Sequence, residues 1–490
     1  MIPAGWEAVI GLEVHVHLKT RSKLFCGCAV GYGDEPNHHV CPVCLALPGA
    51  LPVLNAVAVE LAIRAGLATH CKIHPRSVYA RKNYFYPDLP KGYQISQLDE
   101  PLATGGYVEI TPEGPAGTEP EVRRIGLTRI HMEEDAGKSI HDDALAGPDV
   151  TLIDFNRTSV PLVEIVSEPD LRTPEEVGAY LRSLREILRY VGASDVDMEK
   201  GQFRCDVNVS VRRSGDTALG TRREMKNVNS FRAAENGARA EIARQIEELE
   251  DGGEIQQSTL RYDVESGRLT TMRLKENADD YRYFPDPDLV PVLLDDARIE
   301  EIRGSLPELP DARRERVSEQ YGLSDYDARL LTASRPLADF FEETVRLHGD
   351  AKTVANWISR DVLAALKEEG SELEESALEP PMLAGLLRLV DESRVTARSA
   401  RELIPDLVRE GGDPEAIVRE RGLEAVSDSG ELEALADAAL EENPRAVASF
   451  HDGDGKSLNF LMGQVMKKTG GKADARAVRS LLERKLTGGE

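Results

Sequence analysis

Two short segments of the chain, residues 11–18 and 127–135, carry acidic and histidine side chains at alternate positions. Alternation with apolar residues predicts two strands, each with one buried face and one polar face. Faces that only meet water usually carry Lys, Thr and Ser. Carboxylates beside imidazoles instead favour a face that holds a hard cation, with a merely solvated face as the alternative. The polar residues are Glu13, His15 and His17 in the first segment, and Arg129, His131 and Glu133, followed by Glu134 and Asp135, in the second.

Two later segments, residues 204–212 and 222–230, also predict strands with polar faces. The four segments together supply five carboxylates, which repel one another unless a cation such as Mg²⁺ with bound phosphate oxygens lies among them. Acid and base catalysis of hydrolysis would need only two carboxylates, so the pattern favours metal-assisted phosphoryl transfer. The candidate catalytic and Mg²⁺-binding residues are Glu13, Glu133, Glu134, Asp206 and Glu224, with His15 as a less typical ligand that can act through water.

Phosphate binding through a P-loop is excluded, although Gly-Lys-Ser occurs twice. The first glycine of that motif would fall at Met132 and at Phe450. Any nucleotide is therefore held by metal and side chains, and lysines near the polar segments either bind its phosphates or serve as counter-ions. Aromatic runs at 84–88 and 281–286 either stack a base or pack in the core. The candidate lysines are Lys82, Lys91, Lys138 and Lys226.

Four of the six cysteines occur as two closely spaced pairs separated by a twelve-residue loop. In a cytosolic chain such pairs bind zinc more often than they form disulfides, and four thiolates leave no open position for catalysis. The sequence predicts a structural zinc site, with idle thiols as the alternative and with His38 or His39 as a possible replacement for one thiolate. The predicted ligands are Cys26, Cys28, Cys41 and Cys44.

The length of 490 residues predicts about three domains. No basic leader with an apolar core opens the sequence, and the most apolar stretch, residues 45–68, is interrupted by prolines and charges, which predicts a cytoplasmic protein without membrane contact. A net charge of −26 excludes a general nucleic-acid coat. Residues 451–490 carry a charge of +3, because eight Lys or Arg face five Asp or Glu. That balance allows one positioned contact with a polyanion, while salt adaptation equally explains the acidity.

The order of the predicted elements indicates an α+β fold with a mainly antiparallel sheet, followed by two all-helical modules. Thr173 begins a helix with Pro174 at its first position, and a second long helix begins near Phe231. We predict a catalytic domain at 1–295, which contains the zinc loop 26–44, a helical domain at 296–410 and a C-terminal helical domain at 411–490.

Several short sequence motifs, which follow one another in the same order, resemble those of the B subunit of the tRNA-dependent amidotransferase. They include Ile-Gly-Leu-Glu-Val-His at 10–15, Arg-Lys-Asn-Tyr-Phe-Tyr-Pro-Asp at 81–88 and His-Met-Glu-Glu-Asp-Ala-Gly-Lys at 131–138. Val-Ser-Glu-Pro-Asp at 166–170 and Lys-Asn-Val-Asn-Ser at 226–230 belong to the same set. The resemblance covers essentially the whole chain, including a tail similar to that family's small tRNA-contacting domain.

This resemblance implies a catalytic domain like that of glutamine synthetase and a heterotrimer with a glutaminase A subunit and a small C subunit. The B subunit would use ATP and Mg²⁺ to phosphorylate the side-chain carboxylate of misacylated Glu-tRNA(Gln) or Asp-tRNA(Asn), and ammonia would then displace phosphate. The family's metal and nucleotide positions fall on the six acidic and histidine residues named above. The tail implies tRNA contacts at Lys467, Lys468, Lys472 and Arg476.

Two other functions fit parts of the sequence. A free-standing ligase of the glutamine-synthetase type would use the same polar face, but it would leave the helical modules without a task. A non-catalytic tRNA-binding scaffold held by zinc would gain nothing from five converging carboxylates that repel one another.

Overall fold

The structure is a computed structural model, and it describes residues 2–112, 121–140, 147, 150–228, 230–264, 266–274, 278–425, 429–452, 454–469, 473 and 475–487. The chain divides into two compact units, Met1–Leu309 and Pro310–Glu490. Among the described helices, none is both long and apolar enough to cross a membrane.

The first unit is built around a ten-stranded sheet with the order β15-β14-β13-β12-β1-β11-β8-β6-β2, in which β7 pairs with β8. Among the described strands, every pairing in this sheet is antiparallel except that of β13 with β14. The strands are β1 (Trp6–His17), β2 (Lys72–Ile73), β6 (Ala103–Thr104), β7 (Tyr107–Ile110), β8 (Arg123–Glu134), β11 (Pro161–Ser167), β12 (Phe203–Arg213), β13 (Arg223–Val228), β14 (Ser258–Tyr262) and β15 (Leu269–Leu274). The predicted α+β class with a mainly antiparallel sheet is confirmed.

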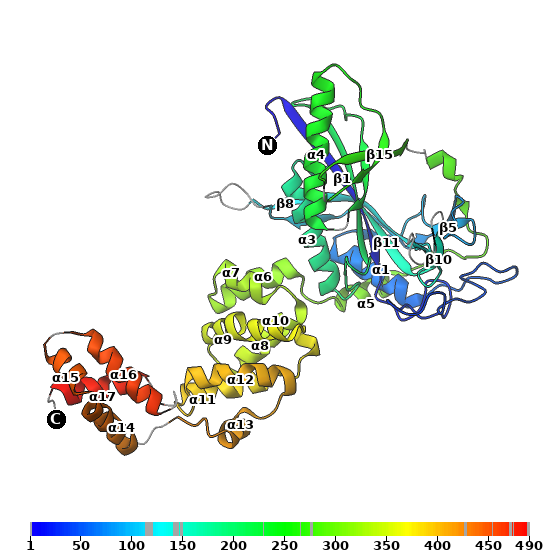
Figure 1. The fold of residues 1–490 in the computed structure, drawn as a ribbon. Helices are drawn as coiled ribbons and strands as arrows, with labels where there is room; N and C mark the ends of the chain where they lie inside the picture. The colour runs from blue at the N-terminus through cyan, green and yellow to red at the C-terminus, as the bar shows by residue number, and fades with distance from the viewer. Residues whose placement is uncertain are drawn as a thin grey trace. The chain divides into compact units, whose positions relative to one another are not determined.

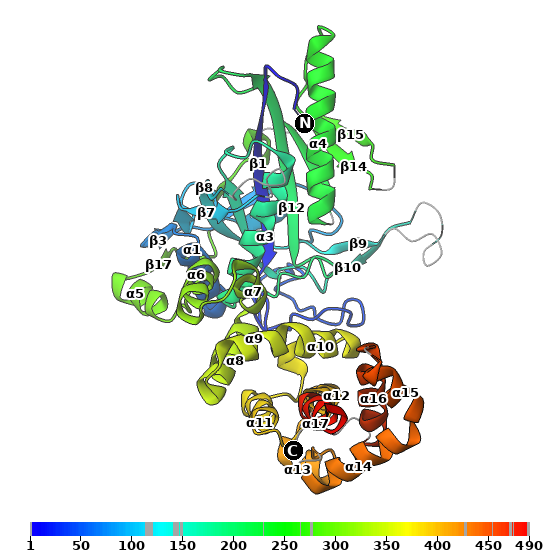
Figure 2. The ribbon, with the colours of Figure 1, turned by 90° about the vertical axis from the view of Figure 1, so that its left-hand side faces the viewer.

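Apolar side chains of the sheet pack against α1 (Ala56–Ala68), α3 (Pro174–Tyr190) and α4 (Phe231–Glu250), and α3 and α4 run along the sheet in Figures 1 and 2. Leu12 and Val14 of β1 are buried in this core. Because side chains alternate along a strand, this packing turns the intervening polar residues to the opposite face. The face away from the helices is therefore available for a site.

The helix start predicted at Thr173 is confirmed. The Thr173 side chain accepts a hydrogen bond of 3.2 Å from the backbone N–H of Glu176, and Pro174 occupies the first helical position. This cap satisfies one of the amide groups that a helix leaves open at its first turn. The helix ends before Gly192, whose φ of +69° is a conformation that glycine adopts without strain.

Three small sheets accompany the main sheet in the described part of the first unit. They are β4 (Ala80–Asn83) with β5 (Tyr93–Ser96) and β16 (Phe284–Pro285), β9 (Lys138–Ile140) with β10 (Leu152–Asp154), and β3 (Arg76–Ser77) with β17 (Val292–Leu293). The unit closes with α5 (Asp296–Gly304), whose Ile299 and Ile302 are buried in the same core as the sheet. This burial explains why the observed division falls at 309/310 rather than before α5, where the sequence placed it.

The second unit is helical and contains two separate hydrophobic clusters, from Val317 to Val418 and from Leu432 to Leu486. The first involves α6 (Pro310–Tyr321), α7 (Asp325–Leu331), α8 (Arg335–His348), α9 (Ala351–Trp357), α10 (Leu363–Glu369), α11 (Pro380–Asp391), α12 (Ala397–Glu410) and α13 (Pro414–Glu420). The second involves α14 (Ser429–Glu442), α15 (Pro444–His451), α16 (Lys456–Lys468) and α17 (Ala475–Thr487). Val418 of α13 packs in the first of these clusters. A domain boundary at 410/411 would instead assign α13 to the C-terminal domain.

Candidate metal centres and active site

Four adjacent strands of the main sheet build the polar face that the sequence predicts. Cross-strand partners in β12, β1, β11 and β8 share a face, so Arg204, His15, Glu164 and His131 form one row across the four strands. The neighbouring row carries Glu13 beside Asp206. The antiparallel register therefore brings together residues separated by up to about two hundred positions in the sequence.

The first cluster of possible metal ligands consists of His15, Glu133 and Glu164, whose ligand atoms all lie within 4.8 Å of one another. His15 Nε2 is 3.4 Å from Glu164 Oε2 and 3.6 Å from Glu133 Oε1. Burial alone would lower the pKa of His15, but the hydrogen bond to Glu164 and the nearby carboxylates raise it to about 9. An imidazole between two carboxylates is a donor set that can hold a divalent cation.

The second cluster consists of Glu13, Asp206 and Glu224, which also lie within 4.8 Å of one another. Its counter-charge comes from Lys226, whose Nζ lies 2.6 Å from Asp206 and 3.2 Å from Glu224. Burial alone would lower the pKa of Lys226, but these two carboxylates raise it above its usual range. Three carboxylates suit a hard cation. In this structure the Lys226 ammonium contacts two of them.

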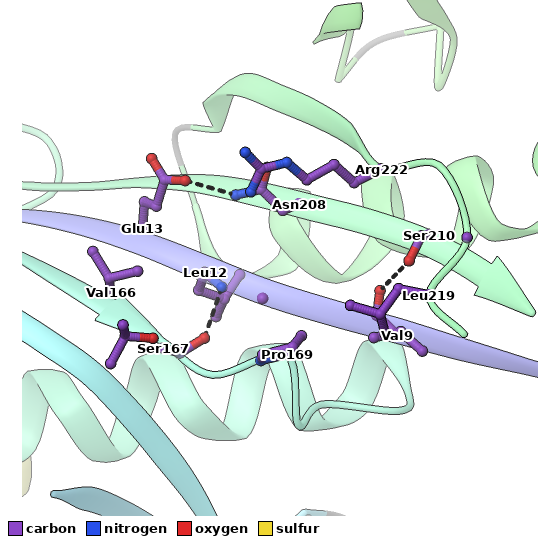
Figure 3. Close-up of a pocket in the computed structure, with 13 residues that line it drawn as sticks. Val9, Leu12, Glu13, Val166, Ser167, Pro169, Asn208, Ser210, Leu219 and Arg222 are labelled. Carbon is purple, nitrogen blue, oxygen red and sulfur yellow. Dashed lines mark hydrogen bonds between the residues drawn. The ribbon is translucent and has the colours of Figure 1, made fainter. Parts of the chain in front are cut away.

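A cavity of about 280 Å³ adjoins the second cluster and shares Glu13 with it. Figure 3 shows Glu13 and Asn208 at one side of this cavity, where Asn208 Nδ2 donates a hydrogen bond of 3.0 Å to Glu13. Ser167 fixes the opposite wall by accepting a hydrogen bond of 2.8 Å from the backbone N–H of Leu12. The remaining lining residues are Val9, Gly11, Thr128, Val166, Pro169, Ser210, Leu219, Gly220 and Arg222. Apolar walls beside the Glu13 carboxylate suit a ligand with an apolar part and a charged part.

Glu134 does not lie with the other predicted carboxylates. It is fully buried, it accepts hydrogen bonds from the backbone N–H of Ile95 and from Ser159, and its ion pair with Lys91 has a length of 2.5 Å. Adjacent residues of a strand point to opposite faces, so Glu133 and Glu134 cannot both reach one cluster through regular strand geometry. The structure assigns Glu134 and Lys91 to each other and not to either candidate metal centre.

The predicted lysines occupy different environments. Lys82 Nζ lies 5.0 Å from the ring centre of Tyr281 and 6.0 Å from that of Tyr84, so the aromatic runs pack around a cation. Burial alone would lower the pKa of Lys82, but Tyr283, Glu133 and other nearby groups raise it. Lys82 of β4 pairs across strands with Gln94 of β5, and Ser96 of β5 donates a hydrogen bond of 3.1 Å to Glu133 of the first cluster. Lys138, in contrast, is exposed on the separate strand pair β9–β10.

The four predicted zinc ligands converge, and the sulfur atoms of Cys26, Cys28, Cys41 and Cys44 lie within 4.8 Å of one another. Cys44 is buried, and Lys23 Nζ lies 3.7 Å from its sulfur atom. His39 pairs instead with Asp34 at 2.9 Å, and neither His38 nor His39 belongs to the sulfur group among the described residues. The four thiols can hold one metal ion without a histidine.

The predicted tRNA contacts lie in the second unit. Lys467 lies in the last turn of α16 and Arg476 in the first turn of α17, and both are exposed. Lys468 Nζ forms an ion pair of 2.7 Å with Glu442. Lys472 lies outside the residues that the structure describes.

One member of the first cluster, Glu164, and its neighbour His131 were not among the predicted site residues. Glu164 pairs with both His15 and His131, at 3.4 Å in each case. His131 Nδ1 is buried and, in the described part of the chain, has no hydrogen-bond partner. The available signal was the alternation in residues 161–167, where Glu164 interrupts an apolar strand. A single glutamate in a strand is a weak signal until the neighbouring strand is known.

Family models match both units of the chain. Residues 8–300 match the GatB/GatE catalytic domain, and residues 339–486 match the GatB domain. The B subunit of the aspartyl/glutamyl-tRNA(Asn/Gln) amidotransferase from Carboxydothermus hydrogenoformans is 52% identical over 481 residues, which cover 98% of this chain and 99% of the relative. The proteins of the same name from Geotalea daltonii and Geobacter sulfurreducens are each 50% identical, and each comparison covers 99% of this chain and 100% of the relative.

The sheet domain with its carboxylate face thus falls in the GatB/GatE class of catalytic domains. The sequence identity of about 50% over nearly the full length narrows this class to one family. The chain belongs to the family of aspartyl/glutamyl-tRNA(Asn/Gln) amidotransferase B subunits. The resemblance noted in the sequence is confirmed.

Replacing Lys226 with Met should make the stability of the first unit depend on Mg²⁺ more strongly than in the wild-type chain. The substitution leaves Asp206 and Glu224 without their ammonium, and the loss of one partner of a largely buried pair costs about 2 kcal/mol after allowance for partial exposure. Addition of Mg²⁺ should recover this loss, and thermal unfolding with and without Mg²⁺ measures it. Lys138→Met, which removes an exposed lysine, is the matched control. Equal Mg²⁺ responses of the two variants would contradict the prediction.

Proposed function

We propose that this chain catalyses the ATP-dependent amidation of misacylated Glu-tRNA(Gln), Asp-tRNA(Asn) or both. It would act as the B subunit of a heterotrimer in which a glutaminase A subunit supplies ammonia and a small C subunit joins the two. This activity makes it a carbon–nitrogen ligase of protein biosynthesis. The proposal is supported by the name of the relatives, which mentions both tRNAs and describes each protein as a subunit.

The observation that carries the proposal is the arrangement of two metal-ligand clusters on one sheet face beside a cavity. Glu13 belongs both to the second cluster and to the cavity wall. A nucleotide whose base occupied the cavity would direct its phosphates towards this cluster, and the first cluster follows along the same strand, at His15. We propose that His15, Glu133 and Glu164 hold one Mg²⁺ and that Glu13, Asp206 and Glu224 hold another. Bound there, Mg²⁺ would neutralise phosphate charge and align the reacting groups.

The reaction requires two substitutions. An oxygen of the aminoacyl side-chain carboxylate attacks the γ-phosphorus of ATP, and the bond from that phosphorus to the oxygen of ADP breaks. Ammonia then attacks the resulting acyl phosphate, so that a C–N bond forms, the C–O bond to phosphate breaks and nitrogen loses a proton. Lys226 lies at the second cluster and Lys82 lies on the strand paired with the one that contacts Glu133, and both would counter the charge that the phosphoryl oxygens bring.

Two further parts of the chain have proposed tasks. We propose that the four cysteines hold a structural Zn²⁺, because four thiolates complete its tetrahedral shell. The exposed Lys467 and Arg476 support a tRNA contact in the second unit, since cations bind phosphate at long range and without sequence preference. The ion pair with Glu442 makes Lys468 a weaker candidate for a tRNA contact than Lys467 and Arg476.

A reconstituted assay tests this function. The chain and its presumed partner subunits are incubated with Glu-tRNA(Gln) or Asp-tRNA(Asn), ATP, Mg²⁺ and ammonium, and the amidated aminoacyl group is quantified. We expect ATP-dependent amidation that Glu133→Gln abolishes, because this change removes a charge from the first cluster. Glu109→Gln, at a partly exposed position of β7 outside both clusters, is the matched control. Amidation that Glu133→Gln leaves intact would move the chemistry away from this face.

A further inference from the structure

Arg204 is a cation on the carboxylate face that has unused hydrogen-bond donors. Its Nη2 donates to Asp135 Oδ2 at 2.7 Å. Its Nε makes no hydrogen bond although it is shielded from solvent, and no partner for Nη1 occurs in the described part of the chain. The side chain is 37% exposed, which leaves part of it accessible to a ligand. An arginine that served only as a counter-ion would be expected to use these donors on protein groups.

Asp135 holds this guanidinium in place. The carboxylate also contacts His17 Nε2 at 2.6 Å and Arg157 Nε at 3.5 Å. Arg157 is satisfied differently, because its Nε and Nη2 donate to the backbone carbonyls of Ala136 and Gly137. Two guanidinium groups share one carboxylate, so the group carries one surplus positive charge even with a neutral His17. This surplus positive charge is available at Arg204, because no donor of Arg204 other than Nη2 makes a hydrogen bond in the described part of the chain.

The position of Arg204 connects it with both clusters. It is the cross-strand partner of His15, and Asp206 lies two residues further along the same face of β12. The two clusters therefore lie beside a guanidinium that Asp135 fixes. A guanidinium binds an oxyanion through two parallel N–H groups, and this geometry suits phosphoryl oxygens.

Building on the proposed function, we propose that Arg204 contacts the phosphoryl group during its transfer from ATP to the side-chain carboxylate and during its departure as phosphate. The guanidinium would donate to an equatorial oxygen of that group through Nη1. No bond is made or broken by Arg204, and no proton moves from it. It stabilises charge that is spread over the phosphoryl oxygens while the P–O bond to ADP breaks and the new P–O bond forms.

The aminoacyl carboxylate offers the same oxyanion chemistry, so the experiment must separate the two sources. The trimeric complex is prepared with the wild-type chain and with its Arg204→Lys, Arg204→Gln and Arg157→Lys variants. Isothermal titration with orthophosphate in the presence of Mg²⁺ and ADP measures phosphate binding, and steady-state amidation measures kcat and the KM for Glu-tRNA(Gln). We expect both Arg204 variants to weaken phosphate binding by about tenfold or more and to lower kcat by about 100-fold, with the KM for Glu-tRNA(Gln) unchanged. Arg157→Lys should retain wild-type phosphate binding.

Three results would overturn the inference. A raised KM for Glu-tRNA(Gln) with unchanged phosphate binding would assign Arg204 to the carboxylate. Equal losses in Arg204→Lys and Arg157→Lys would assign the effect to the Asp135 group as a whole. Unchanged values in both assays would remove Arg204 from the site. The titration needs no turnover, so failure of the wild-type complex to amidate tRNA would reject the proposed function without deciding the role of Arg204.

Discussion

Replacing Glu164 with Gln is expected to reduce ATP-dependent amidation by about 100-fold or more, since changes around metal ligands commonly cost one to two orders of magnitude even outside the first coordination shell. Glu164 contacts both His15 and His131 at 3.4 Å, and it completes the first cluster with Glu133. Glutamine keeps the size of the side chain but loses its charge. The measurement is the amidation rate of the reconstituted complex with saturating Glu-tRNA(Gln) and ATP.

The electrostatic consequence of this substitution provides a second readout. Burial alone would raise the pKa of Glu164, but His131 and His15 hold it well below its usual range. The same interactions raise the pKa of His15, so His15 should titrate at a lower pH in Glu164→Gln. NMR titration of the His15 ring in the metal-free protein measures this shift. Wild-type activity together with an unmoved His15 titration would show that Glu164 is a passive neighbour.

Glu109→Gln serves as the control for the loss of a glutamate charge. Glu109 lies on β7 and pairs with Arg124 on the exposed surface, and neither residue belongs to a candidate metal centre. Its substitution should leave both the amidation rate and the His15 titration at wild-type values. A loss of activity in both variants would indicate a general effect of charge on the fold rather than a role for Glu164.

Removal of metal from the cysteine cluster is expected to destabilise the first unit by about 4 kcal/mol when free Zn²⁺ exceeds its dissociation constant a thousandfold. The cluster connects residues 26–28 with residues 41–44, and Cys44 and Phe25 are buried at its base. Metal that binds only the folded chain stabilises it by mass action. Metal analysis of the purified chain and thermal unfolding with and without a chelator measure the effect.

Cys44→Ser and Cys71→Ala separate the cluster from ordinary buried thiols. Cys44→Ser should lose the bound metal and most of the response to chelator. Cys71 donates to the backbone carbonyl of Gly105 and lies outside the cluster, so Cys71→Ala should keep both the metal and the response. A chain that contains no metal, or whose unfolding temperature is indifferent to the chelator, would reject the structural zinc site.

Local patterns in the sequence were sufficient for the elements that carry the site. Strict alternation in residues 11–18 and 204–212 predicted two strands with polar faces; the first segment follows β1 as far as His17, and the second lies within β12. The Thr173-Pro174 pair predicted a helix start that the structure confirms. These features depend on interactions between residues close in the sequence, namely strand pleating and helix capping, and such signals are readable without a partner strand.

The tertiary structure decided which residues share the site. Glu133 and Glu134 are equivalent as sequence letters, but strand pleating places Glu133 with His15 and leaves Glu134 paired with Lys91. Glu164 and Arg204 join the site only through the register of β11 and β12 against β1. Register depends on long-range packing of the buried face against α1, α3 and α4, which no local pattern encodes. The sequence alone therefore determined the chemistry available to this protein, and the sheet register determined which of its carboxylates and cations can act together.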